Sequence, residues 1–351
     1  MNIARHGTTA AVVMSLLCGT LSVPAADQPL PDPDGKPADM SQKVKVYILM
    51  GQSNMLGFGR VQAGNKPEGS LEHAVKEKEL YQHLIDGEGN WTTRQDVRFV
   101  RVMNDRQFNN EFMTVKGNFG PEIGIGHYVG NAIDAPVMIL KSCIGNRSLG
   151  WDLLPPGTPR YSHEGQECPG YMETVKSKRD NTIVPFVEGG DCLQWYAGKQ
   201  YDSDVAAAKR VLADLDTYYP GAKGYEVDGF FWWQGDKDFR NKAHAAEYEK
   251  NLMRLLKALR KDFDAPEAKL VIATLGQTKK DATGTHGQII NAMFNVADAG
   301  KYPKNKGKVA AVYTNPLSKG GSSSGHYSKH AETYMNVGEA MGKAMAELLA
   351  E

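Results

Sequence analysis

The sequence lacks the features typical of nucleic-acid-binding and membrane proteins. Its 351 residues contain 41 lysines and arginines against 41 aspartates and glutamates, so the formal net charge is zero. A balanced charge gives no support to a nucleic-acid or membrane-surface partner. After the first 25 residues, no apolar run is long enough to span a bilayer. We therefore expect a soluble globular protein with neither nucleic acid nor membrane as its partner.

Cysteines are also few. Of the four, Cys18 lies in the N-terminal apolar segment, and Cys143 closes an apolar run, which favours a buried hydrophobe over a reactive thiol. Cys168 and Cys192 lie in a loop-like region and could pair as a disulfide in an oxidising compartment. There is no Cys-x-x-Cys, His-Glu-x-x-His or paired His/Cys spacing. The sequence therefore gives no reason to expect a metal.

The N-terminus has the layout of a secretory signal peptide, predicted over residues 1–25. It has a basic start at Arg5, an apolar core and a small-residue ending at Val23-Pro24-Ala25. A transmembrane helix is disfavoured because the apolar core is short and is broken by a glycine. Residues 26–43 are rich in Pro and Asp and should form an extended linker. The rest, 44–351, is predicted to be one domain of a secreted or periplasmic protein.

Apolar strands alternate with amphipathic helices along this domain. Continuous apolar strands separated by helices predict a parallel sheet covered on both faces. Two polar insertions, about Gly57–Asn118 and Gly145–Tyr201, follow predicted strands and should leave from the carboxyl edge, where open sheets bind ligands. The predicted strands are Lys45–Met50, Val137–Lys141, Gly229–Trp233, Leu270–Leu275 and Val309–Tyr313, and the predicted helices are Pro121–Asn131, Asp202–Thr217, Ala243–Phe263 and Ala331–Leu349.

Ser53 follows the first of these strands, in the stretch ILMGQSNM. A serine at such a point can be a nucleophile if a base removes its proton and amides receive the oxyanion. Most serines after strands are helix caps instead, and the context is not Gly-x-Ser-x-Gly, which disfavours an ordinary α/β-hydrolase elbow. Three further polar segments lie at turns beside strands or helices: Gly145-Asn146, Gln234-Gly235-Asp236, and His326 before the last helix.

Taken in order, GQSNM, GPE, a glycine-polar loop, WWQGD and HY before a terminal helix resemble the SGNH-hydrolase superfamily. Within it, the chain is most similar to the sialate O-acetylesterase and carbohydrate esterase family six group, from about Lys45 to the C-terminus. The resemblance implies a flavodoxin-like three-layer α/β/α sandwich with a parallel central sheet. It also implies a serine esterase that removes O-acetyl groups from a sugar or polysaccharide and needs no metal or other cofactor.

The resemblance also implies roles for individual residues. Ser53 matches the nucleophile and His326 the general base that takes its proton. The backbone N–H groups of Ser53 and Gly145 would line the oxyanion hole, and the side-chain amide of Gln234 would complete it. Members of the superfamily usually have an aspartate three residues before the histidine, where this chain has Ser323.

The missing acid leaves alternatives open. Asp236, in a position that is usually Glu in the family, is the best substitute, with Asp238 behind it, and a backbone carbonyl is another. Gln52, Asn146 and Arg147 flank the predicted site and are candidates for substrate contacts, although Arg147 could equally pair with a surface acid. Without a carboxylate partner for the base, the chain could be a catalytically weak carbohydrate-binding protein on the same fold. A lipase-like enzyme is disfavoured because the insertions are polar.

Overall fold

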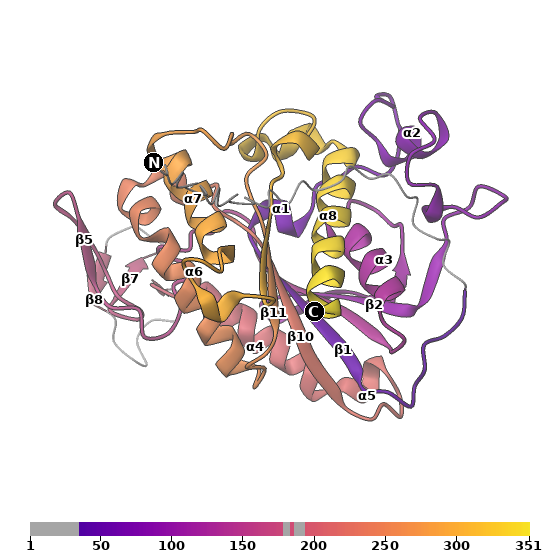
Figure 1. The fold of residues 1–351 in the computed structure, drawn as a ribbon, viewed down its shortest axis with the longest axis horizontal. Coiled ribbons are helices and arrows are strands. Elements are labelled where there is room, and N and C mark those ends of the chain that lie inside the picture. The colour runs from indigo at the N-terminus through magenta and orange to yellow at the C-terminus, as the bar shows by residue number, and fades with distance from the viewer. Residues whose placement is uncertain (1–34, 178–182, 186–193) are drawn as a thin grey trace, which may run out of the picture.

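The computed structural model describes residues 35–177, 183–185 and 194–351 (Figure 1). The predicted signal peptide and part of the predicted linker lie outside these residues, so both stay predictions. Cys168 is a buried free thiol, and Cys192 lies outside the described residues, so their pairing also stays a prediction. No helix of the described residues is long and apolar enough to cross a bilayer.

A seven-stranded sheet runs through the middle of the described chain, in the order β12-β11-β10-β1-β4-β2-β3. All neighbouring strands pair in parallel except β3, which is antiparallel to β2 at one edge. The parallel core predicted from the sequence is thus confirmed, with an antiparallel edge added. The sheet strands are β1 Val44–Gly51, β2 Thr93–Met103, β3 Arg106–Thr114, β4 Val137–Ser142, β10 Tyr225–Trp233, β11 Lys269–Ala273 and β12 Val309–Val312.

Helices cover both faces of this sheet. Along β1, Val46, Ile48 and Met50 pack into one hydrophobic cluster with α4, α6 and α7, whereas Tyr47 and Leu49 pack into a second with α3 and α8. Figure 1 shows these two helical layers on either side of the strands. The three-layer α/β/α sandwich is confirmed. The helices are α1 Ser53–Leu56, α2 Leu71–Lys76, α3 Glu122–Ala132, α4 Lys199–Ala213, α5 Leu215–Tyr218, α6 Lys242–Asp262, α7 Gly284–Ala297 and α8 Ala331–Ala350.

Burial on both faces explains why the central strands are continuous apolar runs. Every residue of β4 is buried, and β1 is buried throughout except for the partly exposed Lys45. Such strands cannot show the alternation of a half-exposed sheet, because neither of their faces meets water. Their carboxyl ends lie at one edge of the sheet, and the loops that leave this edge contain Ser53 and Gly145.

Three expectations about the elements need correction. The first insertion is not only a loop, because its second half supplies β2 and β3 of the sheet. Its strands were missed because TRQDVRFVRVM is rich in charge and only some of its residues are buried. The helix expected over Asp202–Thr217 breaks at Asp214 into α4 and α5, and α7 was not predicted. The second insertion contains the small strands β5 Tyr161–His163, β6 Gln166–Cys168, β7 Thr174–Ser177, β8 Ile183–Pro185 and β9 Gln194–Tyr196.

Candidate active site

Ser53 is the first residue of α1, directly beyond the carboxyl end of β1, and its side chain is largely buried. The turn that delivers it depends on Gly51, whose φ is 150°. A Cβ on Gly51 would lie 2.3 Å from the carbonyl oxygen of Trp233, so only glycine fits where the ends of β1 and β10 meet. The neighbouring Gln52 N–H donates to the same carbonyl at 3.2 Å. The sequence GQSNM thus places a serine at the edge of the sheet.

A buried ion pair supports the helix of Ser53 from below. Lys141 on β4 pairs with Glu122 at the start of α3, and its ammonium also donates to the carbonyl of Leu56, the last residue of α1, at 3.1 Å. The Glu122 carboxylate accepts from the N–H of Gly120 at 3.0 Å. Glu122 lies in the first turn of α3, where its charge suits the helix N-terminus. It therefore has a structural role, and its partner Lys141 was not recognised from the sequence.

Gly145, in the loop after β4, lies against Ser53. A Cβ on Gly145 would be 3.6 Å from the Cβ of Ser53, so the two backbones are close. The next residue, Asn146, is exposed, with a left-handed φ of 55°. The structure thus brings together the two residues whose backbone amides were expected to receive an oxyanion. Whether those amides act as donors in catalysis stays a prediction.

Gln234 lies just beyond β10, fully buried, with its amide already hydrogen-bonded. Its NH₂ group donates to the Asp238 carboxylate at 2.5 Å, to the carbonyl of Arg147 at 2.8 Å and to Gln52 Oε1 at 3.1 Å. Its Oε1 accepts from the Tyr248 hydroxyl at 2.8 Å, which fixes the orientation of the amide. For Gln234 to donate to an oxyanion, it would have to release one of these acceptors.

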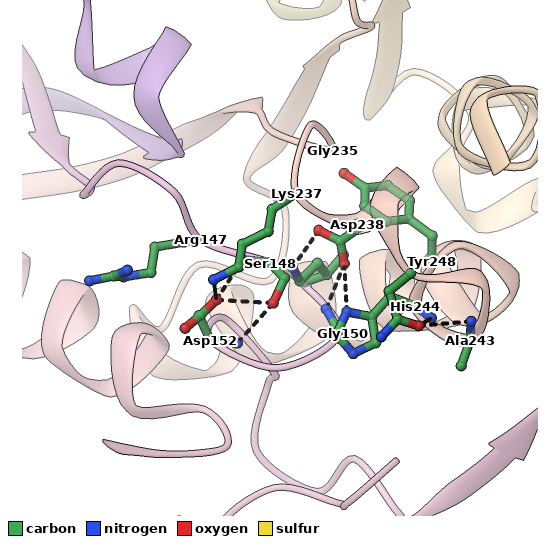
Figure 2. Close-up of polar contacts among 12 residues, drawn as sticks. Arg147, Ser148, Gly150, Asp152, Gly235, Lys237, Asp238, Ala243, His244 and Tyr248 are labelled. Atoms are coloured by element: carbon green, nitrogen blue, oxygen red, sulfur yellow. Dashed lines mark hydrogen bonds and ion pairs between the residues drawn. The ribbon is translucent and has the colours of Figure 1, made fainter. Parts of the chain in front are cut away.

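Asp238 is the centre of this network, at the start of the short 3₁₀ helix η2 Asp238–Arg240. Besides Gln234, it accepts from the backbone N–H groups of Leu149 at 2.9 Å and Gly150 at 2.8 Å. Figure 2 shows its carboxylate between the Gly150 loop and His244 on α6. Burial raises the pKa of Asp238, and the nearby His244 opposes this rise. Asp238 therefore joins the loop after β4 to the loop after β10, a role that sequence reasoning did not assign.

A second carboxylate, Asp152, holds the outer part of the same loops. It accepts from the backbone and hydroxyl of Ser148, from the indole N–H of Trp195 at 3.0 Å and from the Lys237 ammonium at 3.1 Å. The Lys237 ammonium also donates to the carbonyl of Asn146 at 3.1 Å. These bonds close the loop around Gly145 onto the loop after β10.

The three residues expected to contact substrate differ in exposure. Gln52 is buried, and its Oε1 also accepts from the backbone N–H of Lys237 at 3.2 Å, so its side chain ties two loops together. Asn146 is exposed beside Gly145. Arg147 stacks on Trp195, with its guanidinium carbon 4.6 Å from the ring centroid. Contacts from all three to a substrate stay predictions, and Asn146 and Arg147 are the more accessible.

His326 lies in η5 Ser323–Lys329, over α1. Its ring stacks on Phe58, with centroids 4.0 Å apart and planes 8° from parallel. Asn54, next to Ser53, donates to the carbonyl of Ser323 at 3.2 Å, and the Tyr334 hydroxyl donates to the carbonyl of His326 at 3.3 Å. These contacts bring the predicted base and the predicted nucleophile onto neighbouring segments.

The backbone of this loop is unusual. His326, Tyr327, Ser328 and Lys329 all have left-handed conformations, with φ from 49° to 61°. Each such residue costs roughly 1–2 kcal/mol relative to the right-handed form, so surrounding contacts must hold the loop. Tyr327 supplies one, because its ring is buried and its hydroxyl accepts from the N–H of Gly276 at 3.0 Å. Strained backbone of this kind is found preferentially at functional sites.

Asp236 does not contact His326 as expected. One of its carboxylate oxygens accepts from the hydroxyls of Ser323 at 2.5 Å and Ser324 at 2.8 Å, and the other pairs with Arg240 at 3.2 Å. Within the described residues no hydrogen bond joins Asp236 to the imidazole, so the predicted direct contact is wrong. The carboxylate instead accepts a hydrogen bond from Ser323, three residues before His326, at the position where the superfamily usually has its acid.

Nearby charges still act on His326. Burial lowers the pKa of its imidazole, the Asp236 carboxylate opposes that shift, and the Lys329 ammonium adds to it. The imidazole is therefore neutral over a wider pH range than an exposed histidine, which suits a group that must accept a proton.

The fold and this edge of the sheet together define a class of α/β/α protein with a serine and a histidine on adjoining loops. A family model described as carbohydrate esterase, sialic acid-specific acetylesterase, matches residues 170–347, just over half of the chain. The chain belongs to this family, which confirms the resemblance to the sialate O-acetylesterase group. The matched segment contains Gln234, Asp236 and His326, whereas Ser53 and Gly145 precede it.

Solved structures show distant likenesses. A protein from Arabidopsis thaliana aligns with 87% of this chain and 98% of its own, at 15% identity and a TM-score of 0.49. A carbohydrate acetylesterase from Xanthomonas citri aligns with 88% of this chain and 57% of its own, at 13% identity and a TM-score of 0.47. NanS aligns with 74% of this chain and 75% of its own, at 12% identity and a TM-score of 0.41. A search of curated proteins gave no match.

Proposed function

We propose that this protein is a serine esterase that removes O-acetyl groups from a carbohydrate. The observation that supports it most directly is the position of Ser53, at a glycine-dependent turn against Gly145 and below the loop of His326, in a chain of the carbohydrate esterase family. A secreted or periplasmic location stays part of this proposal, because the N-terminal segment lies outside the described residues.

In the proposed reaction, Ser53 Oγ attacks the acetyl carbonyl carbon while the His326 imidazole takes its proton. The negative charge that develops on the carbonyl oxygen would be received by the N–H groups of Ser53 and Gly145. When the tetrahedral intermediate collapses, the C–O bond to the sugar breaks and His326 returns the proton to the leaving hydroxyl. A water molecule, deprotonated by His326, then hydrolyses the acetyl-serine.

Asp236 would act in this scheme as a positioning residue. Its bonds to Ser323 and Ser324 fix the start of the loop, and its charge favours the protonated imidazole. Gln234 would join the oxyanion hole by exchanging one of its present acceptors for the oxyanion. Asp238 would keep the NH₂ group of Gln234 turned toward the loop of Gly145.

The test is hydrolysis of p-nitrophenyl acetate and of acetylated sugars by the purified protein and by Ser53→Ala. Loss of nearly all activity in Ser53→Ala, with full activity in the control Ser203→Ala on α4, would support the proposal. An active Ser53→Ala protein would refute it.

The second candidate is a carbohydrate-binding protein with weak turnover. It is favoured by two observations: Asp236 makes no direct bond to His326, and the amide of Gln234 is engaged with the protein's own acceptors. Binding of a deacetylated sugar without measurable hydrolysis of any acetyl ester would decide for this candidate.

A further inference from the structure

A cavity of about 630 Å³ is lined in part by Arg60, whose backbone is bonded to the loop of His326. Its volume is within the range of roughly 300–1,000 Å³ usual for small-molecule sites. One wall is the segment 60–66 and the other is the segment 115–118, with Glu72 and Trp91 completing the lining. We call it the Trp91 cavity. Nothing in the reaction described above uses it.

The Trp91 cavity adjoins the proposed active site. Phe58, whose ring stacks on His326, precedes its first wall by two residues. The N–H of Arg60 donates to the carbonyl of Lys329, in the loop of His326, at 3.1 Å. Gly59 and Phe119 exchange backbone hydrogen bonds of 2.7 and 3.0 Å, which join the two walls at the end nearest that loop. The cavity thus borders the segments that hold the predicted base.

The lining has positive charge that the protein does not neutralise. Arg60 Nη2 donates to the carbonyls of Lys66 and Glu68, and its Nε is buried without a partner. Among the described residues, no carboxylate forms an ion pair with Arg60 or Lys66. The Glu72 carboxylate, which also lines the cavity, accepts from the N–H of Ala63 at 2.8 Å and forms no ion pair with either of them. A partly buried guanidinium that has no carboxylate partner favours an anionic ligand, above all a carboxylate.

Trp91 adds an apolar surface to this charged lining. It is partly exposed and packs against the cluster beneath α3 and α8. An aromatic ring offers a flat apolar face, and the C–H face of a pyranose is also flat and apolar. A site that combines such a ring with unpaired cations matches a sugar that has a carboxylate.

We propose that the Trp91 cavity is a subsite for an anionic sugar unit next to the acetylated one in an oligosaccharide. This inference rests on the proposed function, because it extends the substrate of the same site. Arg60 and Lys66 would bind the sugar carboxylate, and Trp91 would pack on its ring. The carboxylate could belong to a uronic acid or to a sialic acid, and the binding test distinguishes between the two.

Binding is tested on the full chain with Ser53→Ala, so that no turnover occurs. The probes are trigalacturonate, a dimer of N-acetylneuraminic acid, and neutral maltotriose, measured by calorimetry. We expect one acidic probe to bind more tightly than maltotriose and to weaken with salt. Adding Lys66→Ala should weaken it about tenfold, as for loss of a charge-assisted bond. Trp91→Ala should also weaken binding of the acidic probe. Lys257→Ala, which replaces an exposed lysine on α6, should leave it unchanged.

The acidic probe that binds more tightly shows whether the carboxylate belongs to a uronic acid or to a sialic acid. The proposal is overturned if neither acidic probe binds more tightly than maltotriose, or if Lys66→Ala binds as well as its Lys257→Ala control. Lys66 is the first choice for substitution because it is exposed and its ammonium forms no hydrogen bond or ion pair with the described residues, so its loss should leave the fold intact.

Hydrolysis of p-nitrophenyl acetate separates this inference from the proposed function. The small ester is expected not to reach the Trp91 cavity, so Lys66→Ala should leave its kcat/KM unchanged. If the wild-type protein fails to hydrolyse the ester, the proposed function fails while the binding data still decide the subsite. If Lys66→Ala slows the small ester as much as it weakens the acidic probe, the substitution acts on the fold and the subsite is overturned.

Discussion

The two sides of the proposed active site are built in opposite ways. The oxyanion side, formed by Gln52, Gln234, Asp238 and the loop Gly145–Gly150, is mostly buried, and its side-chain amides and carboxylates are held by several partners at once. The base side, the loop Ser323–Lys329, is partly exposed and runs through four left-handed residues. It is held mainly through Ser323, Tyr327 and the carbonyl of His326.

This difference has a physical meaning for catalysis. Donors that receive a developing charge work best when they are already oriented, because no free energy is then needed to turn them during the reaction. A base that accepts a proton and returns it to a leaving group must also be oriented, and here a partly exposed loop with strained backbone holds it. Loops with few buried contacts belong to the less stable parts of a fold, where motion is concentrated. We therefore expect substitutions on the two sides to affect stability and activity differently.

The largest effect should come from removing the groups that react. Ser53→Ala and His326→Ala should each abolish most of the acetylesterase activity, and the double variant should be little worse than either, because the two residues act as a unit. Initial rates on p-nitrophenyl acetate measure this. Losses that simply multiply would show that the two side chains work independently, and that the comparison of a base side with an oxyanion side is unfounded.

Substitution of Asp238 tests the oxyanion side. Asp238→Ala would leave the N–H groups of Leu149 and Gly150 without a partner and remove one of the three acceptors of the Gln234 NH₂ group. Each unsatisfied buried donor costs about 1–3 kcal/mol, so the melting temperature should fall clearly. We also expect kcat to fall by on the order of 10²-fold with little change in KM, as for loss of an oxyanion donor.

Asp238→Asn and Asp105→Ala are the matched variants for this experiment. Asparagine keeps the shape of Asp238 and one acceptor oxygen, so it should recover part of both losses. Asp105 is exposed on the loop between β2 and β3, and its removal should change neither quantity. A stable Asp238→Ala protein with full kcat would show that this network has no part in either role.

An exchange of residues tests the base side. Asp236→Ser removes the acceptor for Ser323 and Ser324, and we expect kcat to fall by about tenfold or more with little loss of stability. Ser323→Asp alone puts two carboxylates within hydrogen-bond distance, so one must hold a proton. The double variant Asp236→Ser, Ser323→Asp places a single acid at the usual superfamily position, and it should be more active than either single variant.

The coupling between these two positions is the quantity to measure. A double variant no better than Asp236→Ser would mean that the acid has no influence on His326 from either place. The protein would then work as a dyad of Ser53 and His326, and the base side would depend on backbone contacts alone.

The sequence predicted the parts of the molecule that depend on local signals. β1, β4 and the second half of β10 contain continuous apolar runs, and the turn at Gly51 follows one of them. These local signals predicted both the strands and the position of Ser53. The order of Ser53, Gly145, Gln234 and His326 along the chain also indicated the family. Parallel pairing then brings their loops to the same edge.

The remaining features depend on partners that are distant in the sequence. β2 was missed because it is rich in charge and only some of its residues are buried. Lys141 looked like the end of an apolar strand, and only the fold places it against Glu122. Asp236 was expected to reach His326, but Ser323 and Ser324 lie closer and hold it. No local pattern distinguishes between such competing hydrogen-bond partners.

The smallest effect we predict concerns the charge beside the base. The Lys329 ammonium lowers the pKa of His326, in the same direction as burial and opposite to Asp236. His326 accepts a proton only when it is neutral, so activity falls as the pH drops through this pKa. Lys329→Asn removes the positive charge, so the pKa of His326 should rise, and only slightly, because exposed charges interact weakly in water. Asparagine also tolerates the left-handed backbone at this position.

The acid limb of kcat/KM against pH should therefore move to higher pH in Lys329→Asn. Asp236→Asn removes the opposing charge, so its limb should move to lower pH, and Lys257→Asn on α6 should leave the limb unchanged. Opposite shifts in the two variants would show that the base side is tuned by charges on the loop itself. Equal limbs in all three proteins would mean that water screens His326 from both neighbours, and that only burial sets its pKa.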